Sequence, residues 1–213
     1  MARNRPFDEH CDRYEAWFER HRAAYESELQ AIRDMLPSGR GLEVGVGSGR
    51  FAGPLGIGWG VEPSERMRCL ARQRGVDAVE GIAERLPYPD QSFDVVLMVT
   101  TICFVDDLPG ALAEAHRVLR PGGTLVIGFV DRDSPLGRDY EAHRADNVFY
   151  RDATFYSAGE VAEQLALAGF AQLGFRQTIF TPLQEVVSVQ PSRPGSGVGS
   201  FVVVRGQRNP GEA

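Results

Sequence analysis

One loop limits what this chain can fold into more than any other feature. Residues 42–51 read LEVGVGSGRF, an apolar run that carries one acid and then places glycine at every second position, at Gly45, Gly47 and Gly49. Glycine has no Cβ, so it adopts backbone angles that other residues avoid and lets a ligand lie against the main chain. The first N–H groups of a following helix have no partner inside that helix and can donate outward. The segment therefore predicts a strand, a ligand-binding loop and a helix in succession.

The spacing of the glycines separates this loop from two other nucleotide-binding loops. The dinucleotide fingerprint reads Gly-x-Gly-x-x-Gly, whereas this chain reads Gly-x-Gly-x-Gly, and no phosphate-binding lysine of the Walker type follows. A second apolar run ends in Glu62, 62 − 45 = 17 residues after Gly45. A carboxylate at the end of the second strand can accept both hydroxyls of a ribose. The glycines alone fit an ordinary tight turn equally well, but together with Glu62 they favour a nucleoside site.

Four segments in order resemble the class I S-adenosylmethionine-dependent methyltransferases. They are EVGVGSG at 43–49, GVEPS at 60–64, AERLPY at 83–88 with SFDVV at 92–96, and AHRVLRPGGTL at 115–125. They run from about residue 41 to residue 129, and the variety is similar to the small-molecule, type 11 group that includes ubiquinone-pathway enzymes. The resemblance implies an enzyme that transfers a methyl group from S-adenosylmethionine to a small-molecule acceptor. It also implies S-adenosylhomocysteine as the product, and no metal.

The resemblance implies roles for residues around the glycine loop. Glu43 is expected to contact the methionine portion of the donor or to brace the loop. Gly45 and Gly47 are expected to admit the donor, while Glu62, with Pro63 beside it, holds the ribose.

Four further residues are expected at the donor site on the same grounds. The family usually has an aspartate where this chain has Ile82, so Ile82 is expected to pack on the adenine ring and the Ala83 N–H to contact a ring nitrogen. Thr100 and Ile102 follow the apolar run 93–99, which is typical of a central buried strand. We expect Thr100 near the amino-acid end of the donor and Ile102 near the sulfonium.

The alternation of strand and helix patterns predicts an α/β fold with a doubly wound, mostly parallel sheet. The resemblance implies a Rossmann-like methyltransferase fold with seven strands, the final pair antiparallel. The expected strands are 41–44, 58–62, 77–80, 93–99, 124–130, 170–180 and 198–205, and the expected helices between them are 49–55, 65–74, 108–119, 136–147 and 158–168.

The first 37 residues read as one or two helices rich in aromatic side chains. Phe7, Cys11, Tyr14, Trp17 and Phe18 recur at spacings of three and four. This face either packs against the main domain or forms a lid over the substrate pocket, as the segment before the first strand often does in the resembling family. The expected organisation is a lid at 1–37, a donor-binding domain at 38–207 with a substrate-side insertion at 131–156, and a frayed tail at 208–213.

No catalytic acid or base is required by this chemistry. The sulfonium already activates the methyl group, so the protein has mainly to align the reactants and exclude water. If the acceptor is an amine or a hydroxyl, Tyr14, His10 or His143 could help to remove its proton, although each could equally be structural or exposed. The insertion offers further candidate substrate contacts, namely Arg138, Tyr140, Tyr150 and Arg151.

Bulk properties narrow the choice of partner and compartment. The 213 residues suit one domain, and a net charge of −6 argues against a nucleic-acid partner. No apolar run approaches the ~20 residues that span a bilayer, so no membrane partner is expected, and none near the N-terminus suggests a signal peptide. Three scattered cysteines are too few for a disulfide framework or a zinc site. These features predict a cytoplasmic protein.

Two other functions remain open at this stage. A nicotinamide-dependent oxidoreductase fits less well, because the loop lacks the two-residue gap before Gly49 and a Pro-Gly-Gly turn precedes the fifth strand. A non-catalytic protein that binds S-adenosylmethionine or S-adenosylhomocysteine would carry the same motifs. The aromatic N-terminal segment and Tyr150 favour an enclosed pocket and hence an enzyme. The acceptor, the atom methylated and the oligomeric state are left open.

Overall fold

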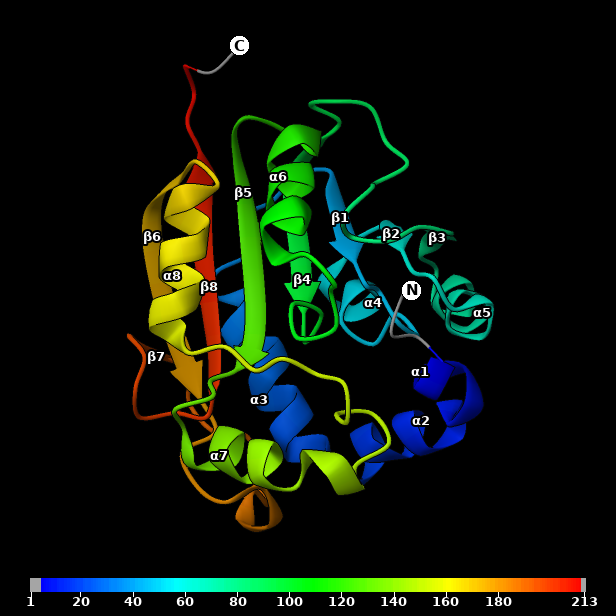
Figure 1. Ribbon diagram of the computed structural model, residues 1–213, viewed down its shortest axis with the longest axis vertical. Helices are drawn as coiled ribbons and strands as arrows, with labels where there is room; N and C mark the ends of the chain where they lie inside the picture. The colour runs from blue at the N-terminus through cyan, green and yellow to red at the C-terminus, as the bar shows by residue number, and fades with distance from the viewer. Residues whose placement is uncertain (1–4, 212–213) are drawn as a thin grey trace.

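A central sheet of eight strands organises the computed structural model, which describes residues 5–211 (Figure 1). The strands stand in the order β3-β2-β1-β4-β5-β8-β6-β7, with β1 to β5 parallel and β8, β6 and β7 joined antiparallel. Their bounds are β1 (Gly41–Val44), β2 (Trp59–Val61), β3 (Asp77–Val79), β4 (Phe93–Val99), β5 (Leu119–Val130), β6 (Phe170–Thr178), β7 (Arg193–Pro194) and β8 (Phe201–Arg208). The predicted α/β fold is confirmed, and the strand beyond the expected seven is the two-residue β7 at the edge.

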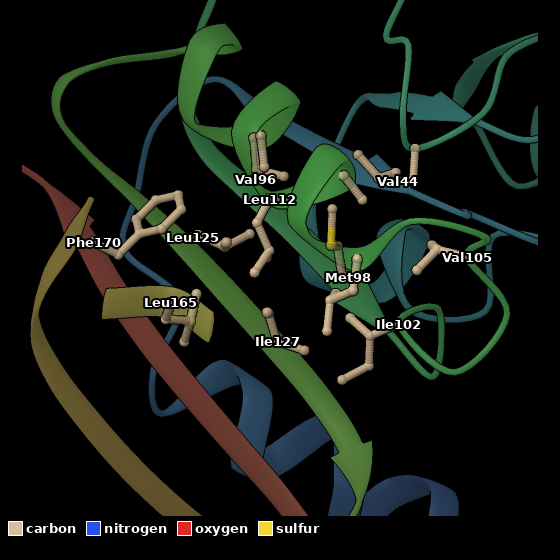
Figure 2. Packing of buried hydrophobic residues seen from close by; sticks show 14 of the residues in the cluster. Val44, Val96, Met98, Ile102, Val105, Leu112, Leu125, Ile127, Leu165 and Phe170 are labelled. Atoms are coloured by element: carbon tan, nitrogen blue, oxygen red, sulfur yellow. The ribbon is translucent and has the colours of Figure 1, made fainter. Parts of the chain in front are cut away.

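Helices cover both faces of the sheet because successive strand residues point to opposite sides. Val96 and Met98 of β4 pack on one side in a cluster with α6 (Leu108–Val118) and α8 (Ala158–Leu167). Figure 2 shows Leu112 of α6 and Leu165 of α8 within this cluster. The alternating residues of the same strand, Leu97 and Val99, pack on the other side with α3 (Arg22–Arg33), α4 (Ala52–Leu55) and α5 (Glu65–Gln73). The central strand is therefore buried on both faces, as its apolar sequence predicts.

The remaining helices gather at the carboxyl end of the parallel strands. The arrowheads of β4 and β5 point toward α1 (Arg5–Glu9), α2 (Cys11–Arg20) and α7 (Pro135–Ala142) in Figure 1. Two short 3-10 helices, η1 (Arg144–Asp146) and η2 (Leu183–Glu185), complete the elements of the described chain. Open parallel sheets bind ligands at this end. Within residues 5–211, no helix is long and apolar enough to cross a bilayer.

Several boundaries differ from the sequence expectation. The N-terminal segment forms α1, α2 and α3 rather than one or two helices, β5 begins at Leu119 rather than at residue 124, α7 ends at Ala142 rather than at 147, and the last strand differs at both ends. The last strand begins three residues late, because the side-chain oxygen of Gln177 accepts the N–H groups of Val198 and Gly199 at 2.9 and 2.7 Å and holds them as a loop. It also extends through Arg208, only 8% exposed, whose guanidinium donates to the Leu119 carbonyl at 2.7 Å. The tail expected from residue 208 therefore starts one residue later, and residues 212–213 lie outside the described chain.

Candidate functional site

A cavity of about 130 Å³ opens where β1, β2 and β4 end, and we call it the first cavity. The glycine loop, the residues after β2, β3 and β4, and two side chains of the N-terminal helices, Phe7 and Tyr14, form its walls. Seven of the nine predicted donor-binding residues line it: Gly45, Gly47, Glu62, Pro63, Ile82, Ala83 and Thr100. The sheet thus brings together residues that are 55 positions apart in the chain.

The glycine loop has a shape that side chains would not allow. Gly45 has φ +68° and Gly47 has φ +52°, both in the left-handed region that favours glycine. A Cβ on Gly45 would lie 2.5 Å from Cγ2 of Thr101, and a Cβ on Gly47 would lie 3.2 Å from the hydroxyl of Tyr14. The absence of both side chains lets Thr101 and Tyr14 approach the loop, while the backbone of Gly45 and Gly47 still lines the first cavity.

Glu62 presents a carboxylate to the first cavity from the end of β2. Its Oε2 accepts the N–H of Gly47 and its Oε1 accepts the N–H of Ser64, both at 3.0 Å. Burial raises the pKa of Glu62 to about 6, although these two backbone bonds act in the opposite direction. A carboxylate offers about four acceptor positions and the backbone occupies two. The remaining positions can accept a pair of neighbouring hydroxyls.

Glu43 lies behind the glycine loop rather than in the first cavity. Its side chain is 1% exposed and accepts the backbone N–H of Ala52, the first residue of α4. Burial raises the pKa of its carboxyl well above the usual range, and Oε2 has no hydrogen-bond partner among the described residues. Of the two roles expected for Glu43, this position fits bracing the loop and not contact with the donor.

Ile102 is also outside the first cavity. The N–H of Phe104 donates to the carbonyl of Thr101 at 2.9 Å, so the chain turns sharply after β4. Thr101 and Phe104 face the first cavity, whereas Ile102 and Cys103 line a second, smaller one. The expected contact of Ile102 with the donor is corrected accordingly, because the direction of each side chain depends on this turn.

The second cavity, of about 20 Å³, lies between β4, β5 and the segment after β5. Tyr140 and Tyr150 have ring centroids 4.9 Å apart, and Tyr150 and Phe155 have centroids 5.6 Å apart. The full lining is Thr100, Ile102, Cys103, Phe129, Val130, Tyr140, Tyr150, Phe155 and Tyr156. The predicted insertion therefore contributes Tyr140 and Tyr150 to a cavity. Its neighbour Phe155, which the sequence did not single out as a contact, joins them there.

Thr100 borders both cavities and has a strained backbone. Its φ is +49°, an unusual value for a β-branched residue, and its N–H donates to the Gly128 carbonyl of β5 at 2.7 Å. Such strain persists only where the surrounding structure imposes it, and it concentrates at functional sites. The residue that the two cavities share is therefore held in place by the fold.

The three candidate proton acceptors differ in their surroundings. Tyr14 lines the first cavity, but burial and the charges of Glu43 and Glu62 raise the pKa of its hydroxyl, so it stays protonated and can donate rather than act as a base. His10 is half-buried, 6.3 Å from the ring of Phe149, and lines neither cavity. His143 is exposed at the end of α7 and lines neither cavity, so its position fits the exposed alternative rather than a contact with the substrate.

The N-terminal helices cover the first cavity. Phe7 of α1 has its ring centroid 5.1 Å from that of Phe104 and 5.2 Å from that of Phe149. Glu15 of α2 forms ion pairs with Arg50 at 2.7 Å and Arg74 at 2.5 Å. Aromatic contacts thus join α1 to Phe104 and Phe149, and ion pairs join α2 to the segments beside α4 and α5. The aromatic density of the sequence left open whether this face packs on the main domain or forms a lid, and it did not indicate these partners.

Comparisons with known proteins agree with this geometry. A family model described as a methyltransferase domain matches residues 42–127. The crystal structure of a Thermotoga maritima protein, described as a SAM-dependent methyltransferase and possible histamine N-methyltransferase, is 51% identical, covers 97% of this chain and 100% of that one, and has a TM-score of 0.96.

Two sequence relatives extend the comparison. An uncharacterized protein of Methanocaldococcus jannaschii is 40% identical over 202 residues, which is 95% of this chain and 98% of that protein. A ubiquinone/menaquinone biosynthesis C-methyltransferase of Burkholderia mallei is 32% identical over 139 residues, 58% of this chain and 56% of that protein. The similarity therefore extends over nearly the whole chain in two of these proteins and over 58% of it in the third.

Proposed function

This chain belongs to the class I S-adenosylmethionine-dependent methyltransferases, and from that premise we propose that it binds the donor in the first cavity and methylates a small molecule presented from the second. The observation that carries the proposal is the meeting of the glycine loop with Glu62. The backbone of Gly45 and Gly47 lines the first cavity, and so does the carboxylate of Glu62, which has two spare acceptor positions. These residues fit an adenosyl ligand, whose ribose offers two neighbouring hydroxyls.

In this proposal, different residues of the first cavity contact different parts of the donor. Glu62, with Pro63 beside it, holds the ribose, while Ile82 and Ala83 meet the adenine. Ile82 lines the first cavity and is 38% exposed, so part of its apolar surface is accessible to a ring. Gly45 and Gly47 lie along the methionine portion, which extends toward Thr100.

Alignment and exclusion of water are the main tasks left to the protein. When bound, the donor supplies a methyl group on a positively charged sulfonium, which needs no acid or base to activate it. In this proposal Thr100, which borders both cavities, fixes the acceptor relative to the donor, and α1 and α2 help to exclude water from the first cavity. Tyr14 acts as a hydrogen-bond donor there. We assign the lid to α1 and α2, the donor-binding domain to residues 22–208, because α3 packs on the sheet and the last strand includes Arg208, and the acceptor side to 131–156.

The acceptor we propose is a small molecule, and the site of action is the cytoplasm. Both sites are small cavities, of about 130 and 20 Å³, and a net charge of −6 opposes an extended polyanion such as a nucleic acid. None of the three cysteines forms a disulfide bond, as is usual in a reducing compartment. The Thermotoga maritima relative is described as acting possibly on histamine, so amines belong in the first acceptor panel beside alcohols and thiols.

Calorimetric titration tests the proposal. Purified protein is titrated in parallel with S-adenosylmethionine, S-adenosylhomocysteine, NAD and NADP. Binding of the two adenosyl ligands alone is the expected result. Binding of NAD or NADP in their place would contradict the donor site and direct attention to redox chemistry.

A further inference from the structure

The second cavity has an unusual lining for a site that must receive a polar reactant. Its volume of about 20 Å³ exceeds the ~10–15 Å³ that one water needs, so it admits one small group such as an ammonium head. No charged side chain lines it in the part of the chain that the structure describes. The aromatic rings of the lining, together with charged groups outside it, therefore determine what binds there.

A buried acid on α3, Glu28, acts through its charge on two aromatic residues of the second cavity. It is 7% exposed on the sheet-facing side of α3, and within residues 5–211 its carboxyl makes no hydrogen bond or ion pair. Burial is the first cause that raises the pKa of Tyr140 and Tyr150, and the charge of Glu28 adds to it in both. The carboxyl of Glu28 is therefore close enough to act electrostatically on both hydroxyls.

Burying an acid without a cation is unfavourable. Burial alone raises the pKa of Glu28 to about 8. A buried carboxyl normally has a cationic partner or several hydrogen bonds, since its charge loses the stabilisation of water. A cation bound on the other side of the tyrosines would offset that loss. An anionic group would meet the carboxylate and the negative faces of the rings with no basic residue to balance them.

We propose that the second cavity takes the amine group of a small amine acceptor, held as a cation by the faces of Tyr140, Tyr150 and Phe155 and by the charge of Glu28. The inference rests on the proposed function, because it takes the first cavity as the donor site. Aromatic faces attract cations through the ring quadrupole, most strongly where water is excluded. The amine and the donor then meet at Thr100, the residue that borders both cavities.

The same surroundings suit the charge that methylation of nitrogen moves. The bound ammonium first loses one proton, to Glu28 or to solvent. Its nitrogen lone pair then bonds to the methyl carbon while the carbon–sulfur bond breaks and leaves its electron pair on sulfur. The positive charge passes from sulfur to nitrogen, and the methylated nitrogen is again a cation among aromatic faces.

A matched pair of probes separates charge recognition from simple apolar fit. The protein is saturated with S-adenosylhomocysteine and titrated calorimetrically with 2-phenylethylamine or with 2-phenylethanol, its neutral counterpart. The titrations are run at about pH 8.5, where an alkylamine is still cationic. The amine is expected to bind at least about tenfold more tightly than the alcohol.

Two sets of variants locate the effect. Glu28→Gln is expected to remove most of the preference for the amine, whereas Glu26→Gln keeps it, because Glu26 lies on the same helix but is exposed and paired with Arg22. Tyr150→Leu is expected to weaken amine binding, and Tyr150→Phe, which keeps the ring, to retain it.

The outcomes distinguish this inference from the proposed function. Equal binding of the two probes by the wild-type protein, or binding of neither, overturns the amine site while leaving the donor site in place. An equal loss of both probes in Glu28→Gln also overturns it, because a structural role would act on both. Failure of S-adenosylhomocysteine to bind the wild-type protein overturns the proposed function itself. If Glu28→Gln does not fold, the Tyr150 pair decides the matter.

Discussion

Replacing Glu62 by glutamine exchanges one carboxylate oxygen at the donor site for an amide NH2 group and removes the negative charge. In the wild-type protein each carboxylate oxygen accepts a backbone N–H at 3.0 Å and keeps a further acceptor position toward the first cavity. A hydrogen bond to a charged group contributes about 1.5–3 kcal/mol. Weakening two such bonds to the ribose costs about 3 kcal/mol, which corresponds to more than a hundredfold in affinity. We therefore expect Glu62→Gln to bind S-adenosylhomocysteine at least about a hundredfold more weakly.

The assay is isothermal titration calorimetry with S-adenosylhomocysteine, accompanied by thermal denaturation. Glu80→Gln serves as the matched control, since Glu80 follows the neighbouring strand β3, is 79% exposed and does not line the first cavity. It should retain wild-type affinity. The reasoning is refuted if folded Glu62→Gln binds S-adenosylhomocysteine within about threefold of the wild-type protein.

Three further predictions follow from the same contacts. The pKa of Glu62 is raised to about 6, and ribose hydroxyls favour its carboxylate form, so the affinity for S-adenosylhomocysteine should fall as pH decreases through 6. Binding should also release protons, which calorimetry in buffers of different ionisation enthalpy detects. An affinity that does not change with pH would contradict this. Gly45→Ala should lower stability and ligand affinity more than Gly56→Ala, since both have positive φ but only the former would meet Thr101, at 2.5 Å; equal losses of melting temperature and affinity would show that the contact is unimportant. The pKa of Glu28 in the folded protein, about 8, exceeds its usual 4.5, so Glu28 lowers the stability of the fold increasingly as pH rises between these values. The melting temperature of Glu28→Gln should therefore rise relative to that of the wild-type protein between about pH 5 and pH 8. The absence of such a rise would argue against a buried, unpaired acid.

The donor side of the site could be predicted from the sequence because its signals are local. A glycine loop after an apolar strand specifies both the turn and its place at the sheet edge. Glu62 ends the next strand, so the register of β1 and β2, which pairs Val44 with Val61, brings it to the loop. Seven of the nine predicted residues line the first cavity for this reason.

The acceptor side could be predicted only in part. The sequence pointed to Tyr140 and Tyr150 of the insertion, both of which line the second cavity, but distant segments complete the site. Glu28, Thr100 and Tyr150 come from three regions of the chain that only the tertiary fold brings together. Helical periodicity places Glu28 on a helix but does not show that it lies on the buried side. The turn after β4 reverses the direction of Ile102, and the last turn of α7 leaves His143 exposed, and neither follows from residue type.

A crystal structure with bound S-adenosylhomocysteine tests the central claim most directly. The account predicts that both ribose hydroxyls bond to Glu62, that the adenine lies against Ile82, and that the sulfur faces Thr100. A ribose away from Glu62, or a sulfur directed away from Thr100, would contradict it.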